Sequence, residues 1–160
     1  MEMPLVPLTS CSPSVRASLG KELHEAFPSE VTSPVIDDDS SAVRFWVRLN
    51  ADAVVACFSI QYEPADGFTP CIGHLYVSPA HRGQGIGKAL LEDALQILSS
   101  EGWDTAYLWC RPALSQYYRD QGWSIITQSL DVIVMSCPIQ LATGFASPYD
   151  SVSSLWSSPW

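Results

Sequence analysis

The sequence predicts a mixed α+β fold built on a largely antiparallel sheet. In its first half, three apolar segments rich in β-forming residues follow one another with short connections, as antiparallel strands do. In its second half, such segments alternate with stretches of helical periodicity. The chain has 160 residues, a length that fits one domain. We expect residues 1–138 to form this domain and residues 139–160 to form a tail that packs on it or on a partner.

The N-terminal region predicts an edge strand followed by a helix. Residues 5–8 are apolar enough for a short strand. Ser12 can cap a helix, Pro13 suits its first position, and apolar residues recur at helical spacing from Val15 onward. The acidic run at residues 37–41 indicates a solvated loop rather than a cation site.

The three strands of the first half and the elements that follow are predicted from periodicity and turn residues. Residues 43–49 and 54–62 form a hairpin pattern, and residues 71–77 a third strand. Residues 86–100 carry one apolar face, and Gly102 can end this helix in the left-handed conformation. The remaining elements are a strand at residues 105–110, a short helix at residues 112–121, and strands at residues 123–127 and 130–137.

The net charge of −9 argues against anionic partners. The chain has 17 Asp and Glu against 8 Lys and Arg, and the basic residues are scattered along the sequence. Nucleic acids and anionic membrane surfaces are bound through basic patches, so neither is predicted as a partner. The acidity is compatible with a cationic substrate.

The five cysteines are odd in number and never form a Cys-x-x-Cys pair. Neither a disulfide framework nor a zinc ribbon is indicated, so we expect reduced thiols, no metal and a cytoplasmic protein. The first eight residues lack the basic region of a signal peptide, and no stretch approaches the ~20 apolar residues that would span a bilayer.

The segment that joins the third strand to the long helix carries the most specific signal. The strand ends at Val77, and Gly83, Gly85 and Gly87 lead straight into the helix. Glycines let the backbone approach a ligand, and the first N–H groups of a helix bind anions, so a phosphate is the natural guest.

Two common phosphate loops do not fit this segment. A Walker A loop needs Gly where Arg82 stands and Ser or Thr where Ala89 stands. A dinucleotide fingerprint needs its third glycine where Lys88 or Leu90 stands.

Two motifs together resemble those of the GCN5-related N-acetyltransferases, the GNAT superfamily. The stretch Arg82-Gly-Gln-Gly85-Ile-Gly87 is similar to the family's Arg/Gln-x-x-Gly-x-Gly/Ala motif. The stretch Tyr117-Tyr118-Arg-Asp-Gln-Gly122-Trp123 is similar to its aromatic-Tyr-x-x-x-Gly-aromatic pattern. The resemblance covers residues 43–137.

The resemblance implies a GNAT-like, mostly antiparallel central sheet of six to seven strands with helices on both faces. It also implies acetyl-CoA as cosubstrate and an acyltransferase of the N-acetyltransferase type. The strand at residues 75–77 would bind the pantetheine arm, and the backbone of residues 82–88 the pyrophosphate. The residues implied to contact the cofactor are Leu75, Tyr76, Val77, Arg82, Gly83, Gln84, Gly85, Ile86, Gly87, Lys88, Arg111 and Tyr118.

The resemblance assigns the proton donor and leaves the proton acceptor open. Tyr118 matches the tyrosine that protonates the departing CoA thiolate. Glu63, and His74 on the strand before the glycines, are the candidates for deprotonating the amine. The alternatives are a structural role for His74 and a substrate that arrives already deprotonated and needs no base. Strand alternation places His74 opposite Leu75 unless a bulge re-aims it. Arg111 stands where many members have an Asn that caps the helix, and it could reach a CoA phosphate instead.

The leading hypothesis is transfer of an acetyl group from acetyl-CoA to a primary amine, with the acidic charge favouring a small cationic molecule. One alternative is acetylation of peptide N-termini or lysines. A second, of another class, is an acyl-CoA-binding module without turnover. Some members of the family carry a glutamate on the strand before the glycines, where this chain has Cys71 and Gly73. The lack of that carboxylate favours the module, and the presence of Tyr118 favours the enzyme. The oligomeric state is open, a homodimer being among the alternatives.

Overall fold

The computed structural model describes residues 3–28, 42–63 and 67–140. Within them, seven strands form one sheet in the order β1-β2-β3-β4-β5-β7-β6. Neighbouring strands run antiparallel except β4 and β5, which run parallel. The strands are β1 (Leu5–Pro7), β2 (Val43–Asn50), β3 (Ala53–Gln61), β4 (Cys71–Val77), β5 (Thr105–Cys110), β6 (Ser124–Gln128) and β7 (Ile133–Pro138).

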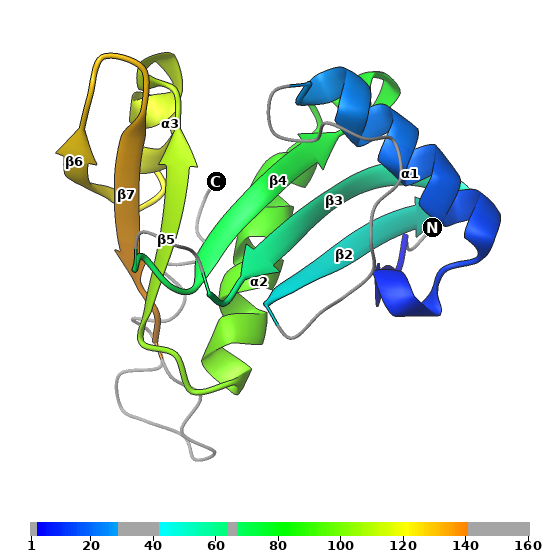
Figure 1. Ribbon diagram of the computed structural model, residues 1–160, viewed down its shortest axis with the longest axis horizontal. Helices are drawn as coiled ribbons and strands as arrows, with labels where there is room; N and C mark the ends of the chain where they lie inside the picture. Colours follow the sequence, from blue (N-terminus) through cyan, green and yellow to red (C-terminus); the bar gives the residue numbers. More distant parts are fainter. Residues whose placement is uncertain (1–2, 29–41, 64–66, 141–160) are drawn as a thin grey trace.

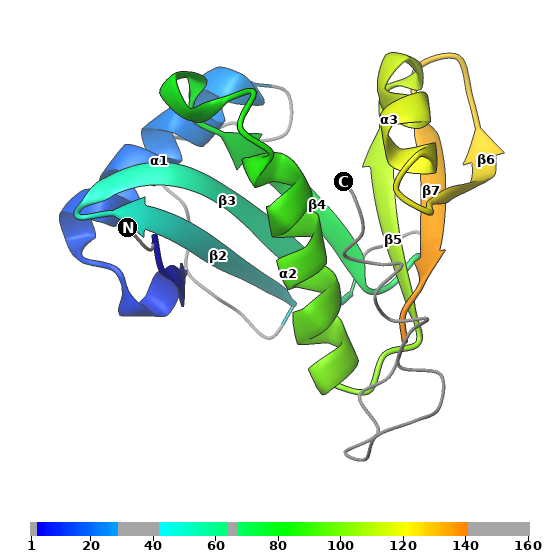
Figure 2. The same cartoon turned by 180° about the vertical axis from the view of Figure 1, so that it is seen from behind.

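Helices cover both faces of the sheet (Figures 1 and 2). Helix α1 (Pro13–Ala26) packs on one face and α2 (Ile86–Ser100) on the other. The short helix α3 (Ser115–Arg119) lies on the same side as α2. The predicted mixed, mostly antiparallel sheet with helices on both faces is confirmed.

Local signals place the helix ends where the sequence predicts them. The Ser12 hydroxyl accepts a hydrogen bond from the Val15 N–H at 3.3 Å, and Pro13 opens α1. Gly102 adopts φ +88° just beyond α2, a conformation in which an L side chain is disfavoured. The segment predicted as one helix at residues 112–121 divides into a 3₁₀ turn, η3 (Pro112–Leu114), followed by α3.

The two apolar cores lie on opposite faces of the sheet. Phe58 of β3 and Met135 of β7 belong to the core under α2, whereas Val47 of β2 and Leu19 of α1 belong to the core under α1. The four cysteines in strands are buried free thiols, as their apolar neighbours indicate. None of the helices in the described part of the chain is long and apolar enough to cross a membrane.

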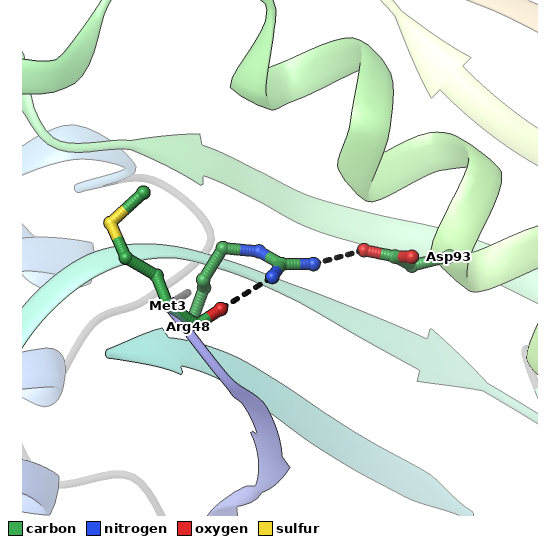
Figure 3. A network of polar contacts seen from close by, with 3 residues as sticks. All are labelled: Met3, Arg48 and Asp93. Atoms are coloured by element: carbon green, nitrogen blue, oxygen red, sulfur yellow. Dashed lines mark hydrogen bonds and ion pairs between the residues drawn. The ribbon is translucent and has the colours of Figure 1, made fainter. Parts of the chain in front are cut away.

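An ion pair ties α2 to β2 and to the N-terminal segment (Figure 3). The Arg48 guanidinium contacts the Asp93 carboxylate of α2 and donates a hydrogen bond to the Met3 carbonyl at 2.6 Å. Because both side chains are partly exposed, water screens the pair, and such pairs contribute about 0.2–1 kcal/mol. Its role is to hold the start of the chain against the sheet and α2.

The predictions for the acidic run and for the C-terminal tail concern residues that are mostly outside the described ranges. The acidic run at residues 37–41 and nearly all of the tail at residues 139–160 lie there. Of the tail, Ile139 is buried, and its N–H donates to the Asp104 carbonyl at 2.7 Å. The division into a domain and a tail therefore stays a prediction.

Candidate functional site

Strands β4 and β5 diverge after the second residue of β4. They pair at two positions only, Cys71 with Tyr107 and Ile72 with Leu108. Beyond Ile72 and Leu108 the two strands separate, as both views show (Figures 1 and 2). We call this region the fork. On its other side β4 stays paired with β3 up to Val77, so β4 is held in place while its β5 side lacks a strand partner beyond Ile72.

A β-bulge lies at the base of the fork. The register of β3 against β4 shifts between Cys57 and Ser59, and His74 adopts φ +48°. A non-glycine residue in this conformation costs about 1–2 kcal/mol. The imidazole Nδ1 of His74 lies 2.7 Å from the Ser59 hydroxyl, which helps to hold it there. Bulges of this kind re-aim side chains and are over-represented next to active sites.

The bulge sorts the side chains of β4 between the two faces of the sheet. Leu75 and Val77 pack on the α2 side, and Tyr76 packs on the α1 side. His74 also faces α1, where its ring centroid lies 5.2 Å from that of Phe45 and 6.1 Å from that of Phe27. His74 is thus on the face opposite Leu75 and Val77, the position that strand alternation predicts.

The glycine segment forms a bare turn at the open end of the fork. Gly83 and Gly85 both have φ +78°, and a Cβ added at either would meet no atom within 4 Å. Gly85 is the N-cap of α2, and no side chain caps the helix. The first N–H groups of this 15-residue helix therefore face an uncrowded turn, which is the arrangement that binds phosphate groups.

The two basic side chains near this turn do not extend freely from it. Arg82 Nε donates a hydrogen bond to the Val77 carbonyl at 2.9 Å, and its guanidinium lies 5.9 Å from the centre of the Tyr76 ring. Lys88 is only 8% exposed, inside the first turn of α2. Burial raises the pKa of the Glu92 carboxyl one turn later, an effect that the Lys88 charge partly offsets. An anion bound at this turn would therefore be held mainly by backbone N–H groups and by the helix dipole.

Tyr118 is a buried phenol at the other side of the fork. Its ring packs edge-on against Trp123, with the centroids 6.4 Å apart. Burial first, then the neighbouring Tyr117 and Cys110, raises the pKa of Tyr118 to about 12. Among the described residues, no hydrogen bond reaches its hydroxyl. At neutral pH it therefore carries a proton that it can donate to a ligand.

Tyr117 of α3 lies close to the residues on the other side of the fork. It is 44% exposed, and its hydroxyl lies 3.7 Å from the point where a Cβ on Gly87 would be. The same point is 3.7 Å from the Val77 side chain. Tyr117 therefore reaches from α3 to the start of α2 and the end of β4.

The structure separates Glu63 from the other predicted site residues. Glu63 follows the end of β3, where Gln61 pairs with Cys71 at the first residue of β4. The glycine turn follows the last residue, Val77, so Glu63 lies at the opposite end of a seven-residue strand, a span of roughly 20 Å. The side chain is exposed and lies at the paired end of β4, away from the glycine turn.

Arg111 stands where the sequence places it, immediately before η3, and does not act as a cap. Its backbone is extended, and no side-chain hydrogen bond caps the turn. Pro112 follows at the first position of the turn. The Arg111 side chain is exposed beside the end of β5.

Glu22 is a carboxylate near the fork that the sequence did not single out. It projects from α1, and the Tyr76 hydroxyl donates a hydrogen bond to its Oε1 at 3.3 Å. Burial raises the pKa of Glu22, the bond from Tyr76 lowers it, and Glu25 raises it further. The available signal was its position beside Leu23, at the border of the apolar stripe of α1.

Comparisons with known sequences point to one family. A family model described as the acetyltransferase (GNAT) family matches residues 12–123. The mycothiol acetyltransferase of Rhodococcus jostii (strain RHA1) is 33% identical over 101 residues, a match that covers 58% of this chain and 31% of that protein. The matched region is therefore about a third of the length of that relative.

Solved structures share the fold. An aminoglycoside 6'-N-acetyltransferase complexed with coenzyme A has a TM-score of 0.70 at 16% identity, covering 88% of this chain and 99% of that one. An acyl-CoA N-acyltransferase from Pseudomonas aeruginosa has a TM-score of 0.66 at 23% identity, covering 85% and 98%. A GNAT family acetyltransferase from Elizabethkingia anophelis with acetyl-CoA bound has a TM-score of 0.59 at 16% identity, covering 86% and 98%.

Proposed function

This chain belongs to the acetyltransferase (GNAT) family, and we propose that it transfers the acetyl group of acetyl-CoA to the primary amine of a small molecule. The proposal rests on the geometry of the fork. It sets an unpaired half-strand, a bare anion-binding turn and a buried, protonated tyrosine around one space. The acidic charge of the chain favours a cationic amine over an anionic acceptor.

The residues of the fork fit a CoA thioester. The backbone of Leu75, Tyr76 and Val77 on the β5 side would hydrogen-bond the pantetheine arm. The N–H groups between Arg82 and Lys88 would hold the pyrophosphate, with room provided by the two glycines of left-handed conformation. Two of the solved structures that share the fold contain coenzyme A or acetyl-CoA, which supports this ligand.

The proposed reaction needs three contributions from the protein. The amine nitrogen attacks the thioester carbon, and an N–H of β4 beyond Ile72 would stabilise the oxyanion. The C–S bond then breaks, and Tyr118 protonates the departing thiolate, which is suited to a phenol that keeps its proton at neutral pH. The third contribution is removal of a proton from the amine.

We assign the removal of that proton to His74. The bulge directs its ring to the α1 face of the sheet, and the bond between Nδ1 and Ser59 of β3 fixes the ring's orientation. Imidazole is the side chain that ordinarily titrates near neutral pH, so it can accept a proton from an ammonium ion through one water. Glu63, the other candidate from the sequence, is exposed in the connection beyond β3, after the residue that pairs with Cys71.

Replacing His74 by glutamine is expected to lower kcat/KM at pH 7 by at least about tenfold, since general-base catalysis commonly contributes 10²–10⁴. The loss should shrink as the pH rises, because the amine then deprotonates in solution. His81→Gln is the matched control, since its imidazole is also hydrogen-bonded to a serine, Ser78, at 2.8 Å. A pH-independent loss in His74→Gln, or an equal loss in His81→Gln, would contradict the role.

The function itself is tested by following CoA thiol release from acetyl-CoA with a panel of primary amines. We expect release that depends on both the amine and the protein, with an acetylated amine as the second product. The outcome that would overturn the proposal is tight acetyl-CoA binding with no thiol release from any amine. That result would favour the non-catalytic acyl-CoA-binding module.

A further inference from the structure

Trp109 is a large aromatic residue of β5 that the structure leaves half exposed. Its neighbours Leu108 and Cys110 belong to the core under α2, so alternation directs Trp109 to the opposite face. It is 52% exposed, and exposing a tryptophan from an otherwise well-packed strand leaves a large apolar area in contact with water. A ligand that packs against Trp109 would remove this apolar area from water.

Trp109 stands at the base of the fork. The last paired residues of β4 and β5 are Ile72 and Leu108, and both point into the core under α2. The next residue of β5 is Trp109, and the bulge of β4 directs His74 to the same face. Trp109 and His74 therefore lie on the two arms of the fork, on the face away from α2. We call this side of β4 and β5 the acceptor face.

The acceptor face is aromatic on both arms. On the β5 arm, Tyr107 lies two residues before Trp109, and its ring centroid is 5.5 Å from that of Phe68. From β4, the His74 ring extends over β3 toward Phe45 of β2 and Phe27 at the end of α1. β4 and β5, both fully described, carry no carboxylate of their own on this face, and the carboxylate bonded to β4 there is Glu22 of α1, which accepts from the Tyr76 hydroxyl.

We propose that Trp109 forms one wall of the acceptor site and makes the preferred acceptor a primary amine with an aromatic or apolar group beside its amino group. A polycationic acceptor needs several carboxylates to pair its charges. The two strands supply none on the acceptor face, and Glu22, bonded to Tyr76, is a single carboxylate beside it. An aromatic group can stack on Trp109, while the amine next to it enters the fork between β4 and β5. The inference rests on the proposed function, from which we take it that the acceptor amine binds on this face.

The test compares two probe amines, phenethylamine and n-butylamine, with the full chain saturated with CoA. We expect Trp109→Ala to raise the Kd of phenethylamine by about tenfold or more, which corresponds to the loss of roughly 1.4 kcal/mol from one aromatic contact. The Kd of n-butylamine should change less than about threefold, and Trp109→Phe should keep phenethylamine binding within about threefold. In turnover, the effect should fall on KM rather than kcat.

Leu130→Ala is the control variant, since Leu130 is 95% exposed and lies in the connection between β6 and β7. It should leave both amines unaffected, and neither variant should alter acetyl-CoA binding. Equal losses for the two amines in Trp109→Ala, no loss for either, or stronger wild-type binding of spermidine than of phenethylamine would overturn the inference. Trp109-dependent binding of phenethylamine without any CoA release would support this inference and overturn only the proposed transfer.

Discussion

Replacing Gly85 by glutamate is expected to raise the Kd for acetyl-CoA by at least about 100-fold. Gly85 is the N-cap of α2, and its Cβ would enter the open turn, where nothing lies within 4 Å. A carboxylate there would sit beside the proposed pyrophosphate. Two like charges 4 Å apart repel by roughly 4 kcal/mol at an effective dielectric constant of 20, and water at the open turn reduces this value. The measurement is a titration of acetyl-CoA by calorimetry.

Gly102→Glu is the matched control for Gly85→Glu. Gly102 has φ +88°, close to the φ +78° of Gly85, so both variants carry a similar backbone penalty of about 1–2 kcal/mol. Gly102 lies beyond the other end of the 15-residue helix α2, roughly 22 Å along its axis. We expect both variants to lose stability in urea and only Gly85→Glu to lose acetyl-CoA. Normal binding by Gly85→Glu would refute the assignment of the glycine turn.

Removing the Tyr118 hydroxyl is expected to lower kcat by about 100-fold or more and to leave the Kd for acetyl-CoA nearly unchanged. The phenol of Tyr118 makes no hydrogen bond with the described residues, so Tyr118→Phe removes no hydrogen bond from the described part of the fold. What it removes is the proposed proton donor to the CoA thiolate, and general acids commonly contribute 10²–10⁴. Steady-state kinetics together with an acetyl-CoA titration separate the two quantities.

Tyr117→Phe is the control for Tyr118→Phe. The Tyr117 hydroxyl lies near Gly87 and can affect how acetyl-CoA binds in the fork. A change in the Kd of acetyl-CoA is therefore compatible with Tyr118 as the proton donor, whereas a 100-fold loss in kcat is not. If the two variants lose kcat equally, the proton donor is wrongly assigned.

The pH dependence gives a second check on Tyr118. Burial raises the pKa of Tyr118 to about 12, so its acid form is present below that pH and is lost only above it. The kcat profile should therefore show no decline due to Tyr118 between pH 7 and 10. A decline in the wild type with an apparent pKa near 10 that disappears in Tyr118→Phe would contradict a protonated, buried phenol.

The sequence alone predicts most of the elements and the cofactor half of the site. Strands β4 and β5 and helix α2 have the predicted bounds, because periodicity, Pro and Gly signals act within a few residues of one another. Ser12 marks the start of α1 and Gly102 lies just beyond the end of α2 for the same local reason. The glycine turn is also local, since a strand, a Pro and three glycines before a helix are contiguous in the chain.

Only the tertiary structure decides the residues of the proposed acceptor half of the site. The order of the strands, with β7 between β5 and β6, and the early end of β4–β5 pairing come from contacts between segments far apart in sequence. Those contacts hold His74 in the bulge, move Glu63 to the far end of β4, bury Lys88 and leave Trp109 exposed. None of these outcomes follows from local propensity, because a side chain's face and burial depend on which strands pair and where the pairing stops.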